Sequence, residues 1–250
     1  MQKRLPLLAA AFVGILSLVV ALSWTGALPG GWTLRGLVWG GAERANWERE
    51  THRAERLAQF RADRDQLPAD SVVFLGSSTI ERFPLAEIFP DRRCVNRGIS
   101  GDTTADLLER LDDSLPTAKP AAFIINIGGN DLRREEQVAA VVRDRLVALL
   151  DELLARYPEA PITVIGLVPA VDADEAELYE FELYNIAARR AAVSRKLPFI
   201  VVQRGPLADA EGRLNAEFAA DNYHLNAAGY RRLAEWILED GGAAGRLLAP

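Results

Sequence analysis

The stretch VVFLGSSTIERFP, residues 72–84, runs from an apolar segment through a glycine into two adjacent serines. Val72–Leu75 is a continuous apolar run, which fits a short strand that is buried on both faces. Gly76, Ser77 and Ser78 then place small side chains directly after the strand, before the chain turns polar. The stretch therefore predicts a strand followed by a turn, and it raises the question of whether the turn presents a nucleophile.

Similar apolar runs recur along the chain, and helical segments separate the later ones. The runs are Val72–Leu75, Cys94–Asn96, Ala122–Ile127, Ile162–Val168 and Phe199–Val202. Helices are predicted over Glu135–Arg156, Glu175–Lys196 and Ala227–Leu238, and Thr103 and Asp106 match a capping box that begins another helix. Strands that alternate with helices indicate a parallel sheet with helices on both faces. We therefore expect a three-layer α/β/α domain over residues 71–250.

The composition limits the classes of function. Cys94 is the single cysteine of the chain, which excludes an intrachain disulfide and a cysteine-based zinc site. His52 and His224 are the two histidines, so we expect no transition-metal site. The net charge is −6 and there is no block of basic residues, so we expect no nucleic-acid partner.

The N-terminal segment, residues 1–24, differs from the rest of the chain. Lys3 and Arg4 precede Leu5–Trp24, a stretch of twenty residues without a charge. An apolar stretch of about twenty residues can cross a membrane as a helix, and the preceding positive charges favour a cytoplasmic N-terminus. We therefore expect a membrane anchor, with the following domain on the extracytoplasmic, periplasmic side. A cleaved signal peptide ending near Ala21-Leu22-Ser23 is the alternative.

Two further segments precede the expected α/β domain. Residues 25–41 hold six glycines and one proline, which predicts a linker. Residues 42–70 are highly charged but carry apolar side chains at helical spacing, which predicts an amphipathic helix. These side chains are Trp47, Ala54, Leu57 and Phe60. His52 lies within this helix among charged residues, so we expect it to be solvated.

Polar residues follow the predicted strands, at the edge of a parallel sheet where ligands bind. They are Gly76-Ser77-Ser78, Arg97–Asp102 and Gly128–Asp131, and Asp221–His224 comes just before the final helix. A serine needs a base to become a nucleophile, and a histidine base needs a third group that fixes its tautomer. His224 is placed to serve as that base, and Asp221 lies three residues before it.

Acyl transfer also requires hydrogen-bond donors that face the negatively charged oxygen of the transition state. Gly101 and Asn130 each follow a predicted strand, so a backbone N–H and a side-chain amide can supply such donors. Each motif on its own has a simpler reading as a turn or a helix cap. Their joint occurrence, in one order along the chain, is the argument for a catalytic site.

This order and wording resemble the SGNH (GDSL-like) hydrolase superfamily, over about residues 71–238. The first family block corresponds to Gly76-Ser77-Ser78 and places the nucleophile at Ser78. The second places an oxyanion glycine at Gly101, and the third, Gly-x-Asn-Asp, places an oxyanion amide at Asn130. The last, Asp-x-x-His, is matched by Asp221 and His224. Ser77 stands where the family usually has aspartate, which leaves Ser77 as a rival nucleophile.

The resemblance implies a flavodoxin-like parallel sheet of about five strands and a serine esterase that needs no cofactor. It implies that Ser78 attacks an acyl carbonyl, that His224 is the base, and that Asp221 orients His224. The Ser78 and Gly101 amides, with the Asn130 side chain, would hold the oxyanion. The expected substrates are small-molecule, lipid or carbohydrate esters. A sugar O-acyltransferase and a non-catalytic surface module remain alternatives.

Overall fold

The computed structural model describes residues 41–249, with side chains from residue 45 onward. The chain divides into two compact units after Ala54. Helix α3 (Gly41–Asp63) supplies the described residues of the first unit and continues into the second, which contains the sheet. Within residues 41–249, no helix combines the length and the apolar character that a membrane crossing requires. The anchor expected over residues 1–24 and all but the last residue of the predicted linker lie outside the described residues.

Helix α3 is shorter than the helix predicted over residues 42–70. It ends at Asp63, and turns follow it through Gln66. Two local features prevent the helix from continuing to residue 70. Pro68 disfavours helical backbone at the residue before it, and Asp70 adopts a φ of +61°.

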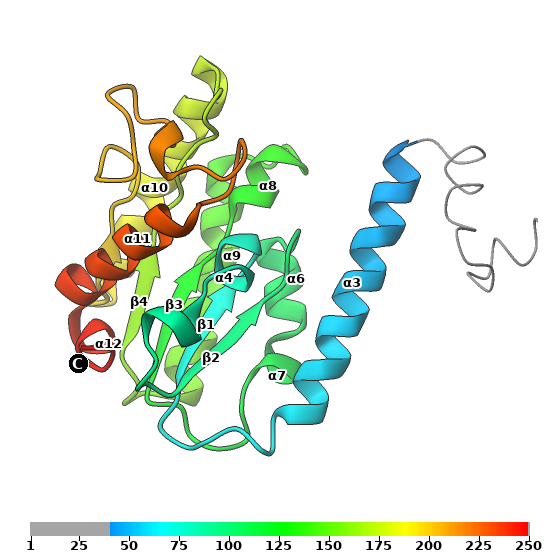
Figure 1. The fold of residues 1–250 in the computed structure, drawn as a ribbon, viewed down its shortest axis with the longest axis vertical. Coiled ribbons are helices and arrows are strands. Elements are labelled where there is room, and N and C mark those ends of the chain that lie inside the picture. The colour runs from blue at the N-terminus through cyan, green and yellow to red at the C-terminus, as the bar shows by residue number, and fades with distance from the viewer. Residues whose placement is uncertain (1–40, 250) are drawn as a thin grey trace, which may run out of the picture. The chain divides into compact units, whose positions relative to one another are not determined.

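Five parallel strands form one sheet in the order β2-β1-β3-β4-β5 (Figure 1). The strands are β1 (Val72–Gly76), β2 (Cys94–Gly98), β3 (Ala122–Asn126), β4 (Ile162–Ile165) and β5 (Phe199–Ile200). The predicted three-layer α/β/α architecture with a five-stranded parallel sheet is confirmed. The order reverses between β1 and β3, so the carboxyl ends of these two strands flank the crevice where such sheets bind ligands.

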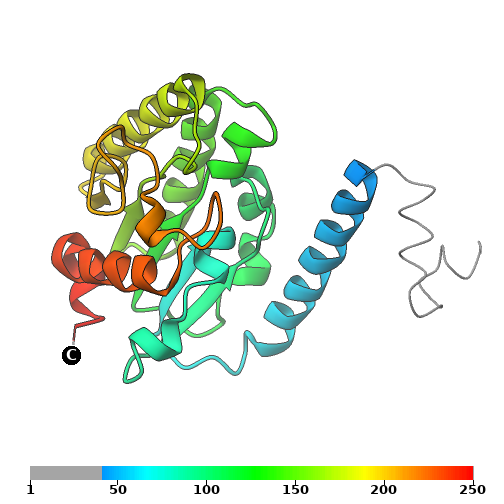
Figure 2. The same cartoon turned by 45° about the horizontal axis from the view of Figure 1, so that its top comes forward.

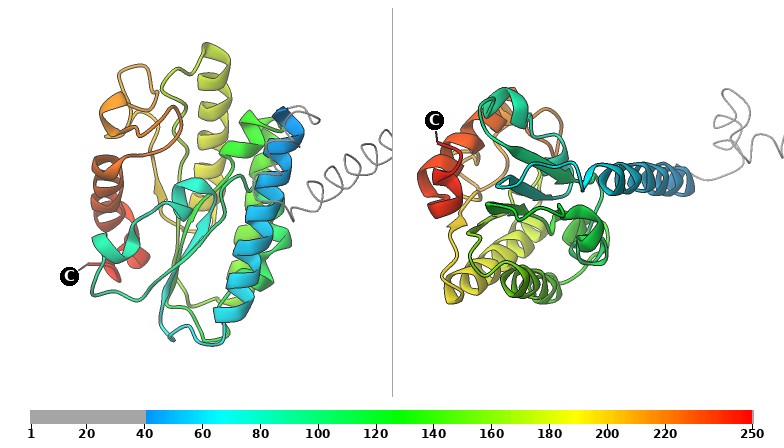
Figure 3. Two further views of the ribbon diagram at one scale, coloured as in Figure 1. Left: turned by 45° about the vertical axis from the view of Figure 1, so that its right-hand side comes forward. Right: turned by 90° about the horizontal axis from the view of Figure 1, so that it is seen from below.

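Helices cover both faces of the sheet (Figures 2 and 3). The strand side chains alternate between two apolar cores. On β1, Val73 and Leu75 point into one core, and Val72 and Phe74 into the other. The first core includes residues of α6 (Thr104–Glu109), α7 (Leu111–Ser114), α9 (Ala139–Arg156) and α10 (Glu175–Ser194). The second includes residues of α4 (Ser78–Glu81), α5 (Leu85–Ile88), α11 (Ala227–Asp240) and α12 (Gly242–Arg246).

Two glycines allow the short helix α4 to lie directly against the ends of β1 and β2. A Cβ atom at Gly76 would lie 2.6 Å from a side-chain carbon of Ile80 on α4 and 2.1 Å from the carbonyl oxygen of Asn126 on β3. A Cβ atom at Gly98 would lie 2.2 Å from the backbone nitrogen of Glu81, the last residue of α4. Asn96 strengthens this contact by donating its side-chain amide to the Ile80 carbonyl at 2.6 Å. The position of Ser78 is therefore set by backbone packing.

We predict that Gly98→Ala destabilises the fold. The added methyl group meets the Glu81 backbone, which cannot yield as a flexible side chain would, and overpacking of this kind costs about 1–3 kcal/mol. Urea unfolding of the two proteins measures the difference. Gly129→Ala is the matched control, because the nearest atom to its Cβ would be an arginine side-chain nitrogen at 3.6 Å. An unchanged free energy of unfolding in Gly98→Ala would show that α4 can leave β2 without cost.

Candidate active site

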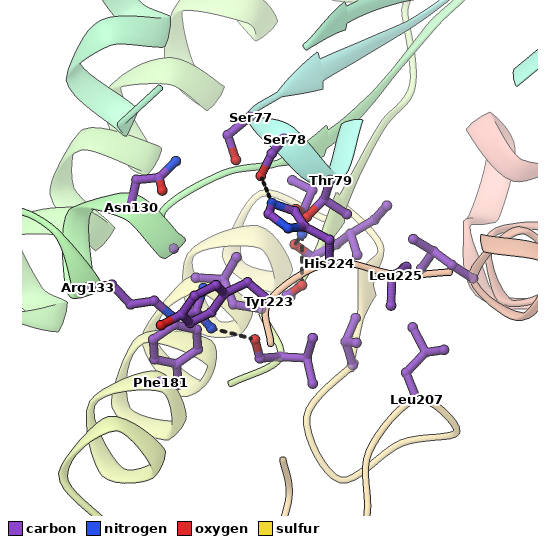
Figure 4. Close-up of a pocket in the computed structure, with 18 of the residues that line it drawn as sticks. Ser77, Ser78, Thr79, Asn130, Arg133, Phe181, Leu207, Tyr223, His224 and Leu225 are labelled. Atoms are coloured by element: carbon purple, nitrogen blue, oxygen red, sulfur yellow. Dashed lines mark hydrogen bonds between the residues drawn. The ribbon is translucent and has the colours of Figure 1, made fainter. Parts of the chain in front are cut away.

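Ser78 lies where β1 gives way to α4. Ser77 precedes the helix as its N-cap residue, and its carbonyl accepts hydrogen bonds from the N–H groups of Ile80 and Glu81. This tight turn directs the Ser78 hydroxyl toward the loop before α11, where its Oγ lies 3.1 Å from Nε2 of His224 (Figure 4). Ser77 also lines the cavity at this site, but no hydrogen bond joins its side chain to the helix that follows.

Asp221 holds the other side of the His224 ring. Nδ1 of His224 lies 2.8 Å from each carboxylate oxygen of Asp221. One of these oxygens also accepts the backbone N–H groups of Tyr223 and His224, at 2.9 Å each. A proton on Nδ1 donated to this carboxylate leaves Nε2 free to accept the Ser78 hydroxyl proton. The spacing of three residues thus forms a closed turn that fixes both the carboxylate and the ring.

The Asp221 carboxylate is ionised at neutral pH. Desolvation acts to raise its pKa, but hydrogen bonds from the Tyr223 N–H and from the side chain and N–H of His224 outweigh it and hold the pKa at about 2. Arg82 adds a weak ion pair at 3.5 Å. The carboxylate can therefore stabilise a positive charge on His224 over the whole neutral range.

Two neighbours of this pair connect its loop to the rest of the site. Asn222 accepts the N–H of Val171 on its carbonyl at 3.0 Å and the N–H of Asp172 on its side-chain oxygen at 3.2 Å. The ring of Tyr223 lies over the guanidinium of Arg133, 4.8 Å from ring centroid to Cζ. The His224 loop is therefore fastened to the segment that follows β4 and to helix α8 (Gly129–Arg133).

Asn130, on α8, donates its side-chain amide to the carbonyl of Asp102 at 2.9 Å. An amide nitrogen carries two hydrogens, so one remains for a ligand in the cavity, which Asn130 and Ser78 both line. Gly101 lies in the turn after β2 with a φ of +88°, a conformation that favours glycine. Gly101 is not among the residues that line this cavity. The next residue, Asp102, connects the Gly101 turn to the cavity, because its carbonyl accepts the Asn130 amide.

Arg110 fixes this turn from inside the protein. Its side chain is 1% exposed, and its Nε donates to the Asp102 carboxylate at 2.5 Å. Its Nη2 donates to the carbonyl of Gly76 at 3.1 Å and to that of Arg97 at 3.0 Å. One guanidinium thus connects the residue before the serines, the end of β2 and the residue whose carbonyl holds Asn130.

Asp131 fastens the same turn from the side of α8. Its carboxylate is fully buried and accepts the N–H of Thr104 at 2.9 Å and the Thr104 hydroxyl at 2.5 Å. Burial raises the pKa of Asp131, against the hydrogen bonds from Thr104 and Arg145. Arg134 donates to the Gly101 carbonyl at 2.7 Å. The turn from Gly101 to Thr104 is therefore bound on two sides.

The cavity beside Ser78 has a volume of about 410 Å³, and both polar and apolar side chains line it. The polar side chains include Ser77, Ser78, Asn130, Arg133, Arg134 and His224. The apolar side chains are Ile165, Leu167, Val168, Phe181, Val202, Leu207, Leu225 and Leu233. Within residues 41–249, no group of three or more histidine, cysteine or acidic side chains lies close enough together to hold a metal ion.

The structure brings most of the predicted site residues together. Ser78, His224 and Asp221 form one hydrogen-bonded row, and Asn130 lines the same cavity. Such a row can transfer a proton from a serine to a histidine, as nucleophilic catalysis requires. The sequence analysis assigned no role to the residues that support this row: Asp102, Arg110, Arg133 and Asn222. Asp102 and Asn222 lie in the polar segments that it named, and the structure confirms the capping box that it predicted at Thr103 and Asp106.

Known proteins resemble this chain in sequence and in fold. A family model described as GDSL-like Lipase/Acylhydrolase family matches residues 81–232. The matched segment includes Gly101, Asn130, Asp221 and His224, and it begins three residues after Ser78.

Individual relatives cover most of the chain. The human platelet-activating factor acetylhydrolase IB subunit alpha2 is 25% identical over 173 residues, which cover 67% of this chain and 74% of that protein. Esterase TesA of Pseudomonas aeruginosa is 29% identical over 151 residues, which cover 60% of this chain and 70% of that protein. A solved structure described as a putative platelet activating factor from Streptococcus pneumonia superimposes with a TM-score of 0.71, at 25% identity, over 78% of this chain and 94% of that one.

We predict that the contribution of Asp221 to stability depends on pH. Its pKa is lower in the folded protein than its ordinary value of 3.8, so its charge stabilises the fold above that value and loses this effect as pH falls toward about 2. Asp221→Asn should therefore lower the free energy of unfolding at neutral pH, and the difference should shrink in acid. The side chain is 49% exposed, so solvent keeps the difference small. Urea unfolding at a series of pH values tests this, and a difference independent of pH would contradict it.

Proposed function

The chain belongs to the GDSL-like lipase/acylhydrolase family, hydrolases that act on ester bonds, and on this premise we propose that it is a serine esterase with an acyl-enzyme on Ser78. The observation that carries the proposal is the row of hydrogen bonds from Ser78 through His224 to Asp221. Ser77 is the rival nucleophile, but it is the Ser78 hydroxyl that lies 3.1 Å from Nε2 of His224, within hydrogen-bond distance.

The proposed reaction has two halves. Oγ of Ser78 attacks the carbonyl carbon of the ester while Nε2 of His224 takes the hydroxyl proton. The tetrahedral intermediate collapses, and His224 returns that proton to the leaving alcohol, which leaves an acyl-enzyme. His224 then takes a proton from water, the hydroxide attacks the acyl carbon, and the proton returns to Ser78 as the acid departs. Asp221 keeps the ring in the required tautomer and stabilises the imidazolium in both halves.

The oxyanion that forms in each half needs fixed donors. We assign this role to the backbone N–H groups of Ser78 and Gly101 and to the second hydrogen of the Asn130 amide. The bond from Asn130 to Asp102 supports the assignment, because it fixes the amide in place before substrate binds.

The cavity supports a substrate with a hydrocarbon part. Eight apolar side chains line it beside Ser78, and its volume of about 410 Å³ lies within the usual range for small-molecule sites. The names of the relatives, an acetylhydrolase and an esterase, agree with the hydrolysis of carboxylic esters. We propose acyl esters of a lipid or another small alcohol as substrates. Assays with and without sugar acceptors distinguish hydrolysis from transfer.

We predict that the full-length protein hydrolyses an aryl acetate or butyrate and that a serine-directed phosphonate labels Ser78. Ser78→Ala and His224→Ala should abolish both the hydrolysis and the labelling, because each removes a member of the hydrogen-bonded row. Mass spectrometry of the labelled peptide identifies the serine. Labelling of Ser77 in a protein whose Ser78 stays unmodified would contradict the assignment.

We predict that Asn130→Ala lowers kcat by about 10²–10³-fold, the usual effect of removing one oxyanion donor. KM should change little, because the donor acts mainly on the transition state. Steady-state kinetics measure both constants, and circular dichroism verifies that the variant is folded. A folded Asn130→Ala protein with the wild-type kcat would remove this side chain from the mechanism.

A further inference from the structure

The second part of helix α3, from Glu55 to Asp63, belongs to the compact unit that holds the site, although it precedes both the sheet and the family-matched segment 81–232. Its side chains reach the end of β2 and helix α4. This placement allows residues outside the matched segment to affect the proposed chemistry.

Arg56 makes two contacts with the catalytic region. Its Nε lies 3.3 Å from Oε1 of Glu81, the last residue of α4, and its Nη2 donates to the carbonyl of Gly98 at 3.1 Å. The side chains of Arg56 and Glu81 are 20% and 16% exposed. This ion pair is therefore partly shielded from water, and the attraction between its charges is stronger than it would be at the surface.

Glu81 also contacts the turn that carries Gly101. Its second carboxylate oxygen accepts the backbone N–H of Ser100 at 2.5 Å. One carboxylate thus joins three parts of the protein: helix α3, the short helix that begins at Ser78, and the residue just before Gly101. The Gly101 N–H is one of the proposed oxyanion donors. It belongs to the peptide group that follows the Ser100 N–H, so its direction depends on how the backbone of Ser100 is held.

Phe60, one turn further along α3, keeps Arg56 in position. Its ring is fully buried, and the guanidinium carbons of Arg97, Arg56 and Arg110 lie 4.4, 4.8 and 5.7 Å from the ring centroid. Stacking on an aromatic face stabilises a guanidinium and restricts its rotamers. The same ring covers Arg110, which binds Asp102 on the far side of the Gly101 turn.

We propose that Arg56 is a positioning residue for the proposed oxyanion site and that it acts through Glu81 on the Ser100–Gly101 turn. This inference rests on the proposed function. Without Arg56, the Glu81 carboxylate loses this cation and is held less firmly, so the Ser100 N–H loses a fixed acceptor. The Gly101 N–H then points less accurately at the oxyanion, which weakens binding of the transition state more than binding of the substrate.

The test compares Arg56→Gln with Arg61→Gln in the full-length protein. Arg61 is a matched control because it lies on the same helix and pairs with Asp113 at 2.6 Å, away from the site. Arg56→Gln should lower kcat about tenfold, which corresponds to roughly 1.4 kcal/mol of the barrier, and should leave KM nearly unchanged. Arg61→Gln should keep the wild-type kcat. Arg56→Lys, which keeps the charge, should recover part of the loss.

A double-mutant cycle tests the route through Glu81. Glu81→Gln should cause a similar loss of kcat, and Arg56→Gln combined with Glu81→Gln should lose no more than either change alone. A merely structural role for Arg56 predicts a lower free energy of unfolding with a normal kcat for the folded protein. That result, or fully additive losses, would overturn the proposal.

Backbone NMR distinguishes a failure of this inference from a failure of the proposed function. If the wild-type protein hydrolyses no ester, the proposed function is wrong, whatever Arg56 does. The amide signals of Ser100 and Gly101 should still shift in Arg56→Gln and stay in place in Arg61→Gln. Unchanged signals in Arg56→Gln would show that Arg56 does not hold the turn.

Discussion

The buried guanidinium of Arg110 is the interaction on which the geometry of the site depends. A charge removed from water is tolerated only where its donors find acceptors, and Arg110 finds them at the ends of two strands and on Asp102. The acceptors at Gly76 and Arg97 are backbone carbonyls, so the cation fixes main chain and not only side chains. Removing it would leave the Asp102 carboxylate and these carbonyls buried without this donor. The position of the turn before α6 is thus set by the hydrogen bonds that satisfy one internal charge.

The fold could be predicted from the sequence because its strands are continuous apolar runs. All five predicted runs are strands, and the errors lie at their carboxyl ends. The run Ile162–Val168 ends as a strand at Ile165, since the Leu167 backbone pairs with the Asn185 side chain instead of a neighbouring strand. The helix predicted from Glu135 begins at Ala139, after Glu136 adopts a φ of +49°. Local backbone geometry of this kind has no signature in hydrophobic patterning.

The candidate site divides in the same way. Ser78, Asn130, Asp221 and His224 could be predicted, because their types and order form motifs whose chemistry requires them. Arg110 could not, because an arginine that binds a buried carboxylate has the same letter as one that faces water. Arg56 and Phe60 lie in a segment for which the sequence predicted only an amphipathic helix. The surface against which that helix packs is formed by residues far along the chain, and the periodicity of apolar residues within the helix carries no information about them.

The contact between helix α3 and Glu81 has a consequence for evolution. Arg56 and Glu81 lie 25 positions apart, on opposite sides of the boundary at which the family match begins. If one carboxylate serves both the helix and the Ser100 turn, selection acts on these two stretches as a unit. Substitutions at position 56 should covary with those at position 81 among homologues that retain α3. Homologues without this helix must hold the turn by different residues. The residues near the nucleophile should therefore differ between homologues with α3 and homologues without it.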